Sequence, residues 1–482
     1  MTSTLLSNAR LYGTDALVDL LVVDGVISSL DEGALEKLDD RVDLEGRFVG
    51  PGLWDAHVHV GQWALRSNRV DVSSAASAAE TVALVRAAIA ASPPAPGTVF
   101  VGQGFRDGLW PDSPSAQLLE VGGVPVSLVS GDVHTVWTNS AALRSLGRPE
   151  SDWWLREQPA FDLNVQLSSV PPAQLDTWVL AAATAAASRG VVGISDFEFD
   201  DAAGAWGRRF AAGFRGLRVR ALVYPPHLDA AAAADIHTDQ AIDGTGGLLT
   251  GGPFKLFTDG SLNTRTAWCD DPYPGSTSHG LPTYGDGELL DLAREGIRLG
   301  IVPTIHAIGD HAVTVALDTF EALGSGGSIQ HVQLAHPDDL PRFARLGVRA
   351  SVQPEHAMDD RDVADHFWRG RTDRAFAYRS LLEAGTELEL GSDAPVAPLD
   401  PWVAIAAAVT RSRDGLPPWH PEQALPVEAA LRASWGRVGG LAAGGAADLV
   451  ITEADPLSAP QDSLRTMPVW GTMLAGEWTH RA

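Results

Sequence analysis

The sequence has a single cysteine, Cys269, among its 482 residues. One thiol excludes an intrachain disulfide and a zinc site built from several cysteines. Basic residues are also scarce, because 35 lysines and arginines stand against 61 aspartates and glutamates, for a formal net charge of −26. Nucleic acids and anionic membranes bind basic patches, so this charge argues against both as partners. We expect a small-molecule ligand instead.

Long hydrophobic runs are missing as well. The most apolar stretch, residues 178–194, is mostly alanine and contains Thr184, Ser188, Arg189 and Gly190. It predicts a helix that leads into a strand, not a membrane span. The first residues lack the basic start and apolar core of a signal peptide. With 45% hydrophobic and 20% charged residues, the composition is typical of a soluble globular protein, and we expect it to be cytoplasmic.

Short β-rich runs alternate with helical runs along most of the chain, which is the pattern of a parallel α/β sheet. Helices are predicted between many of the strands, and two of them end in a glycine where a C-cap needs one. Eight strands in series predict a closed (β/α)8 TIM barrel. The predicted strands are residues 47–53, 191–195, 218–224, 253–257, 302–306, 328–334, 348–352 and 388–392.

Two further strand-like runs, residues 98–105 and 125–134, would raise the count to ten. We place them in an insertion of roughly residues 66–175, after the first barrel strand. The barrel with this insertion is predicted to span residues 51–430.

The two ends of the chain share short strands, turns and few helix signals. We predict that residues 1–50 and 431–482 meet beside the barrel and form one small discontinuous β-sandwich.

The strongest local motif is PGLWDAHVHV, residues 51–60. Alternation along a strand places His57 and His59 on the same side, so that both imidazoles can reach one ion. The pair falls at the carboxyl end of a predicted strand, where barrel active sites lie. A His-x-His pair is common by itself, so the interpretation as a metal site depends on further ligands.

Four more candidate ligands end predicted strands: Lys255, His306, His331 and Asp393. Each has a structural alternative. The histidines could be core residues bonded to backbone carbonyls, the aspartate a helix N-cap, and the lysine a strand residue that reaches solvent. Their joint occurrence at strand ends, in this order, favours a metal centre.

This order resembles the amidohydrolase superfamily, which has His-x-His on the first strand, Lys on the fourth, His on the fifth and sixth, and Asp on the eighth. The segments KLFTDGSLNTRTA, HAIGDHAV, QHVQLAHPDDL and GSDAPVAPLDPW are similar to blocks of the subgroup typified by N-substituted formamide deformylases, amidohydrolase family 3. The resemblance covers nearly the whole chain. It implies a distorted (β/α)8 barrel with a β-sandwich from both termini.

The resemblance also implies a ligand arrangement. His57, His59 and Asp393 would hold one divalent ion, while His306 and His331 would hold a second. Lys255 would bridge the two ions after carboxylation by carbon dioxide. Imidazole and carboxylate ligands suit zinc, with manganese, iron or nickel as alternatives, and a one-metal version of the site stays open.

Substrate contacts are harder to predict from the sequence. By resemblance, His134 in the insertion could reach over the pocket and contact the substrate, and a hydrogen bond within its own turn is the alternative role. Asp259 and Arg265 follow the Lys255 strand and could orient the substrate or only their own loop. Trp54 lies beside the His-x-His motif and, in a chain with 15 tryptophans, indicates an aromatic-lined pocket, although core packing is its alternative role.

We therefore expect a metal-dependent hydrolase that cleaves a C–N bond, of amide or formamide type, in a small apolar or aromatic substrate. A metal-activated hydroxide would attack the carbonyl, with Asp393 as the catalytic proton carrier. Two alternatives remain. The same site could hydrolyse esters or lactones or catalyse dehydrative cyclisation, or the chain could be a non-catalytic scaffold. Members of the superfamily are often dimers or larger assemblies, so the resemblance makes a homodimer one candidate assembly, although no residue of the sequence establishes an interface.

Overall fold

The computed structural model describes residues 2–29, 38–95, 97–105, 107, 110–130, 135–156, 158–285 and 287–482. The chain divides into two compact units. One unit comprises residues 1–60 and 183–482, and the other comprises residues 61–182. Within the described ranges, no helix is both long and apolar enough to cross a membrane.

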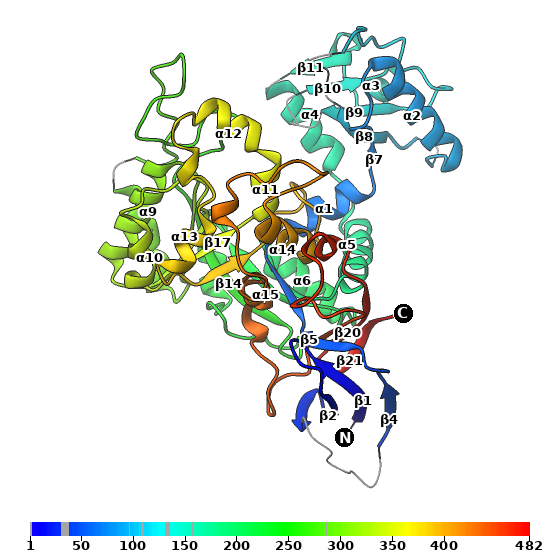
Figure 1. The fold of residues 1–482 in the computed structure, drawn as a ribbon. Helices are drawn as coiled ribbons and strands as arrows, with labels where there is room; N and C mark the ends of the chain where they lie inside the picture. The colour runs from blue at the N-terminus through cyan, green and yellow to red at the C-terminus, as the bar shows by residue number, and fades with distance from the viewer. Residues whose placement is uncertain are drawn as a thin grey trace. The chain divides into compact units, whose positions relative to one another are not determined.

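The larger unit contains a sheet of eight parallel strands in the order β18-β17-β16-β15-β14-β13-β12-β6. Figure 1 labels β14 and β17 of this sheet. A parallel bridge between Val58 and Ala394 joins the first strand to the segment that follows the last, and so closes the barrel. The predicted (β/α)8 fold is confirmed. The strands are β6 (Leu53–Val58), β12 (Val191–Asp196), β13 (Arg218–Val223), β14 (Leu249–Phe257), β15 (Pro303–Ala307), β16 (Gly327–His331), β17 (Val348–Val352) and β18 (Leu388–Leu390).

Helices connect these strands, and their apolar faces pack on the barrel. Helix α9 ends at Gly324, which has a φ of 64°, and α10 ends at Gly347, which also has a φ of 64°. Both glycines adopt the left-handed conformation that the predicted C-caps require. The helices of this unit are α6 (Ala202–Ala211), α7 (Leu228–Ala233), α8 (Glu288–Arg298), α9 (Asp310–Leu323), α10 (Leu340–Leu346), α11 (Pro354–Asp359), α12 (Arg361–Phe367), α13 (Tyr378–Glu383), α14 (Pro401–Thr410) and α15 (Val427–Trp435).

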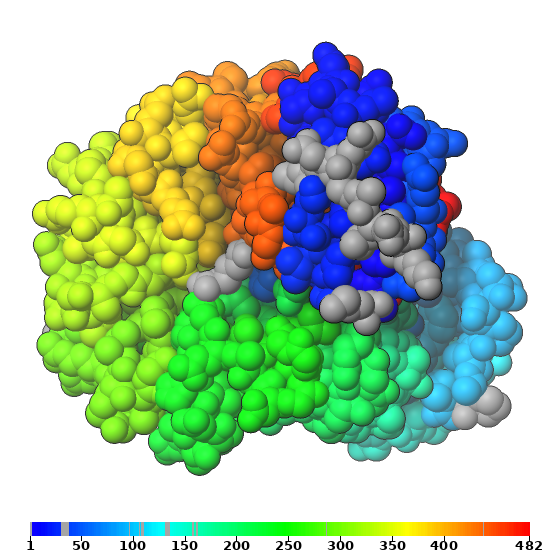
Figure 2. Space-filling model, turned by 90° about the horizontal axis from the view of Figure 1, so that it is seen from below, coloured from blue at the N-terminus to red at the C-terminus, as the bar shows by residue number. Residues whose placement is uncertain are grey.

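The two ends of the chain form one eight-stranded sheet in which β5 pairs with β19. Figure 2 shows the blue N-terminal segment against orange and red C-terminal residues. The strand predicted over residues 47–53 is two strands, because β5 belongs to this sheet and β6 to the barrel. The strands of the terminal sheet are β1 (Ser3–Leu11), β2 (Leu17–Val23), β3 (Val26–Ser29), β4 (Asp40–Asp43), β5 (Phe48–Pro51), β19 (Leu449–Thr452), β20 (Val469–Leu474) and β21 (Glu477–Arg481).

The smaller unit has its own five-stranded sheet, in the order β11-β10-β9-β8-β7, and its own core around Phe105 and Trp137. The two additional strand-like runs of the sequence are β8 and β9 of this sheet. The boundary between the two units along the chain falls within helix α5 (Pro172–Ala187). The other elements are α1 (Val60–Ser67), β7 (Val70–Asp71), α2 (Ala78–Ala91), β8 (Phe100–Phe105), β9 (Val126–Ser130), β10 (Thr135–Thr138), α3 (Ser140–Ser145), β11 (Trp154–Arg156) and α4 (Gln158–Ser168).

Candidate metal centre

His57 and His59 lie at the carboxyl end of β6 and point toward Asp393, which follows β18. The Nε2 atom of His57 is 3.4 Å from Asp393 Oδ1, and that of His59 is 3.5 Å from the same oxygen. The two rings are 5.6 Å apart. Asp393 has a φ of 54°, a left-handed conformation that few non-glycine residues adopt. One carboxylate oxygen thus faces both imidazoles.

The next three predicted ligands lie in the last residues of β14, β15 and β16, which are neighbours in the barrel. The ring of His331 lies 5.1 Å from that of His57 and 4.5 Å from that of His306. His57, His331 and Asp393 each offer a ligand atom, and these atoms lie within 4.8 Å of one another. Lys255 is buried with its Nζ 4.8 Å from the centre of the Phe197 ring. The fold therefore gathers the six side chains that the sequence singled out around one end of the barrel.

His306 partly matches its structural alternative, because its Nε2 lies 3.0 Å from the carbonyl oxygen of Gly260. That carbonyl can only accept a hydrogen bond, so Nε2 carries the proton. The lone pair of Nδ1 then remains available for an ion. A backbone contact of this kind often fixes the tautomer of a metal-binding histidine, so it is compatible with a ligand role.

Burial favours the neutral forms of these side chains, and for the imidazoles the neutral form is the one that binds a metal. Burial is the main cause that lowers the pKa of His57 and His331 well below the ordinary range and that of His59 to about 3. It also lowers the pKa of Lys255 to about 7. Burial raises the pKa of Asp393 to about 7, against the opposite effect of the Lys255 charge.

Several buried nitrogen atoms near Asp393 have no hydrogen-bond partner among the described residues. They include Nδ1 of His59, Nδ1 of His331 and Nε2 of His356. Unpartnered polar atoms are costly in a protein interior, whereas neutral imidazoles beside a carboxylate are suitable divalent-metal ligands. The residues present therefore fit a metal centre.

The four predicted substrate contacts are not brought together in the same way. Asp259 accepts hydrogen bonds from the backbone of Trp268, Ile308 and Gly309, at 2.8, 3.1 and 2.8 Å, and so organises its own loop. Arg265 is exposed and lies over the ring of Phe367.

Trp54 is the neighbour of Asp55 on β6, so strand alternation turns its side chain away from the face that carries His57. Its indole donates a hydrogen bond to Ser195 at 3.2 Å. His134 lies outside the described residues. The substrate roles of these residues stay predictions.

The structure adds three residues that the sequence analysis did not select. Phe197 stacks on His57 with ring centres 3.6 Å apart. Gln330, on β16, has its Oε1 2.8 Å from Nδ1 of the same imidazole. His356, on α11, has Nε2 3.8 Å from Asp393 Oδ2. Its position directly after the seventh barrel strand was the only sequence signal for this role.

Aromatic side chains also lie around the predicted ligands. Phe199 is 52% exposed and stacks on His59 and beside Tyr224, with ring centres 5.1 Å apart in both pairs. Phe257 lies beside His306, with ring centres 5.2 Å apart. Partly exposed aromatic rings next to the predicted ligands provide an apolar contact surface.

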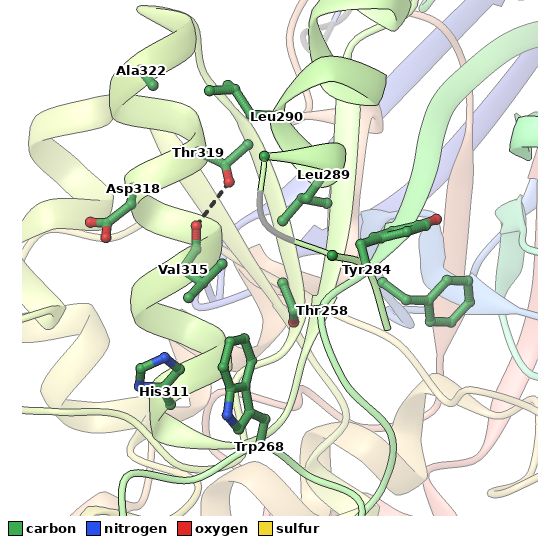
Figure 3. A pocket seen from close by; sticks show the side chains of 13 residues that line it. Thr258, Trp268, Tyr284, Leu289, Leu290, His311, Val315, Asp318, Thr319 and Ala322 are labelled. Carbon is green, nitrogen blue, oxygen red and sulfur yellow. Dashed lines mark hydrogen bonds between the residues drawn. The ribbon is translucent and has the colours of Figure 1, made fainter. Parts of the chain in front are cut away.

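Phe257 also lines a hollow of about 500 Å³ between α8 and α9 (Figure 3). Trp268 and His311 lie side by side at one end of it, with ring centres 4.2 Å apart, and Ala322 lies at the other end. Tyr284 and Leu289 line the α8 side. Phe257 thus belongs both to the surroundings of the predicted metal ligands and to this hollow.

A barrel with histidine, lysine and aspartate side chains at its strand ends is the architecture of a metal-dependent hydrolase. Residues 40–480 match the model of the amidohydrolase family, and the chain belongs to that family.

Relatives and solved structures agree with this assignment. The chain is 26% identical to the YtcJ protein of Bacillus subtilis (strain 168), over 95% of this chain and 94% of that one. It is 29% identical to an N-substituted formamide deformylase of Arthrobacter pascens, over 48% and 45% of the two chains. A metal-dependent hydrolase from Pyrococcus horikoshii OT3 superimposes with a TM-score of 0.82 at 26% identity, covering 96% of this chain and 99% of that one.

Proposed function

We propose that this hydrolase cleaves the C–N bond of a small amide or formamide with an apolar or aromatic substituent. The main observation in support is the placement of Asp393, whose Oδ1 faces His57 and His59 while its Oδ2 faces His356. Such a carboxylate can bind an ion with one oxygen and move a proton with the other. The similarity to a formamide deformylase and the exposed ring of Phe199 beside His59 support this substrate class.

Two divalent ions, zinc in the first instance, would occupy the site. Manganese, iron or nickel would suit the same nitrogen and oxygen donors. His57, His59 and Asp393 would hold one ion, and His306 and His331 the other. Lys255 would bridge them as a carbamate, formed when its neutral amine adds to carbon dioxide and releases a proton. The lowered pKa of Lys255, about 7, supports this because only the neutral amine reacts.

Bound ions lower the pKa of a coordinated water from about 15.7 to about 7 and polarise a carbonyl. Asp393, with a pKa raised to about 7 by burial, accepts the proton of the attacking water. It then donates this proton to the leaving nitrogen, because an amide anion is a poor leaving group. The products are a carboxylic acid, or formic acid, and an amine. The aromatic rings around the ligands hold the apolar substituent.

Matched substrates test this proposal. N-benzylformamide and N-benzylacetamide would be compared with benzyl formate, a γ-lactone and an amino-phenol-type substrate that can undergo dehydrative ring closure. We expect the highest kcat/KM with the amides. Turnover of the ester or lactone, or ring closure, without turnover of the amides would favour the alternative use of the same site. A metal-loaded protein that turns over none of them would favour the scaffold role.

A further inference from the structure

Gln330 is a buried residue of β16 whose side-chain amide contacts a proposed metal ligand directly. It is 2% exposed, and its Oε1 lies 2.8 Å from Nδ1 of His57. Its Nε2 donates to the hydroxyl of Thr304 at 2.8 Å. That hydroxyl lies 2.7 Å from the hydroxyl of Ser328, so a short chain of hydrogen bonds holds the amide in place.

The backbone at the end of β16 allows Gln330 and the next residue to face the same centre. Strand alternation would send consecutive side chains to opposite faces. His331 has a φ of 76° and Val332 a φ of 46°, both in the left-handed region. This turn brings the ring of His331 within 5.1 Å of the His57 ring, while Gln330 reaches the same ring through Nδ1.

His57 has two neutral tautomers, and only one of them can bind an ion through Nε2. If Nε2 carried the proton, it would donate toward Asp393 Oδ1, which is 3.4 Å away. That bond would occupy the ligand atoms of both residues. A proton on Nδ1 that is donated to Gln330 leaves the Nε2 lone pair and the carboxylate free. Phe197, stacked 3.6 Å from the ring centre at an interplanar angle of 13°, fixes the plane of the ring.

We infer that Gln330 is a positioning residue that selects the metal-binding tautomer of His57 by accepting the Nδ1 proton. The inference rests on the proposed metal site. A hydrogen-bond partner on the second nitrogen of a ligating histidine orients the ring, and its loss lowers metal affinity about 10- to 100-fold. The neutral amide of Gln330 thus has the same role for His57 that the backbone carbonyl of Gly260 has for His306.

The test is the dissociation constant for zinc, measured on the metal-free full chain by competition with a chelator. Gln330→Met keeps the side-chain length and removes the acceptor, so we expect the dissociation constant to rise about 10- to 100-fold. Gln330→Glu restores an acceptor and should recover most of this affinity. The control is Gln353→Met, the same change at a buried glutamine just after the neighbouring strand, whose amide donates to Ser351. It should stay within about threefold of the wild type.

A second readout reports the tautomer itself. In histidine-labelled metal-free protein, the ¹⁵N shifts of His57 should show a protonated Nδ1 in the wild type and a shift toward protonated Nε2 in Gln330→Met. An unchanged dissociation constant and tautomer in Gln330→Met would overturn the inference, as would an equal loss in Gln353→Met. A wild-type chain that binds no zinc would overturn the metal site and this inference with it.

Discussion

At the scale of single residues, His356 lies next to Oδ2 of Asp393, the carboxylate oxygen that does not face His57 and His59. Its Nε2 is buried, lacks a hydrogen-bond partner among the described residues, and lies 3.8 Å from Oδ2. Burial lowers the pKa of His356 to about 4, so its ring is neutral at neutral pH and can donate one hydrogen bond through its single N–H group.

We predict that His356→Asn lowers kcat about 10- to 100-fold, because the oxygen that moves the proton loses the neutral imidazole 3.8 Å away. Bound metal should be unchanged. Steady-state kinetics and metal analysis check this. His366→Asn, on the exposed side of α12, is the control and should match the wild type. Loss of metal in His356→Asn would instead assign this residue to metal binding.

Lys255 makes assembly of the site depend on pH. Its pKa is lowered from 10.5 to about 7 by burial, so the neutral amine dominates above pH 7. At constant dissolved carbon dioxide, reconstitution of metal-free protein with zinc should increase about tenfold between pH 6 and pH 8, following the neutral fraction. Lys255→Met should abolish the carbon dioxide dependence. A flat profile in the wild type would contradict carboxylation.

The same shift affects stability in a definite direction. Between pH 7 and 10.5 the unfolded chain binds more protons at Lys255 than the folded chain does. The metal-free protein should therefore gain stability from this group as pH rises through that window. Below pH 7 the buried, charged Lys255 should destabilise the folded state by its full amount.

The residues of the site could be predicted where their pattern lies along one strand, as for His57 and His59. It could not be predicted where partners come from different strands. Gln330 and Phe197 approach His57 only because parallel strands bring their ends together, and the left-handed turn at His331 breaks the alternation that a sequence reading assumes.

At the scale of elements, the close approach of β6 to the end of β18 depends on Gly391. A Cβ atom at this position would lie 2.7 Å from the backbone nitrogen of His57 and 2.9 Å from its Cβ. We predict that Gly391→Ala costs about 1–3 kcal/mol, because one of the strands must move. It should also weaken zinc binding. Denaturant unfolding and metal titration measure both effects.

Gly207 in α6 provides the matched control, because nothing lies within 4 Å of a Cβ placed there. Gly207→Ala should stabilise the chain by up to about 1 kcal/mol through helix propensity. If both alanine variants change stability equally, the steric account of Gly391 is wrong.

Alternation of strands and helices was sufficient to predict the barrel strands. It did not reveal that residues 47–53 belong to two sheets. Pro51 ends β5 and Leu53 begins β6, so only Gly52 separates them, and hydrophobic periodicity does not resolve so short a break. A Cβ atom placed on Gly52 would lie 2.4 Å from the side chain of Val192, a close approach that only the three-dimensional structure shows.

At the scale of the whole molecule, an ion pair joins the terminal sheet to the barrel. Arg218 on β13 bonds through Nε and Nη2 to Asp448, whose side chain is 2% exposed. We predict that Arg218→Ala lowers the free energy of unfolding by about 3 kcal/mol, because it leaves a buried carboxylate without its cation. Arg298→Ala, which removes the exposed pair with Glu295, should leave it unchanged. Equal unfolding midpoints for the two variants would contradict this.

The central claim is that His57, His59, Lys255, His306, His331 and Asp393 form one metal centre. Metal content per chain, measured on purified wild type and on His331→Asn together with the mass of the Lys255 peptide, tests it most directly. The account predicts two divalent ions and a carboxylated lysine in the wild type, and at most one ion in the variant. A wild-type chain without metal, or a variant with the full complement, would contradict it.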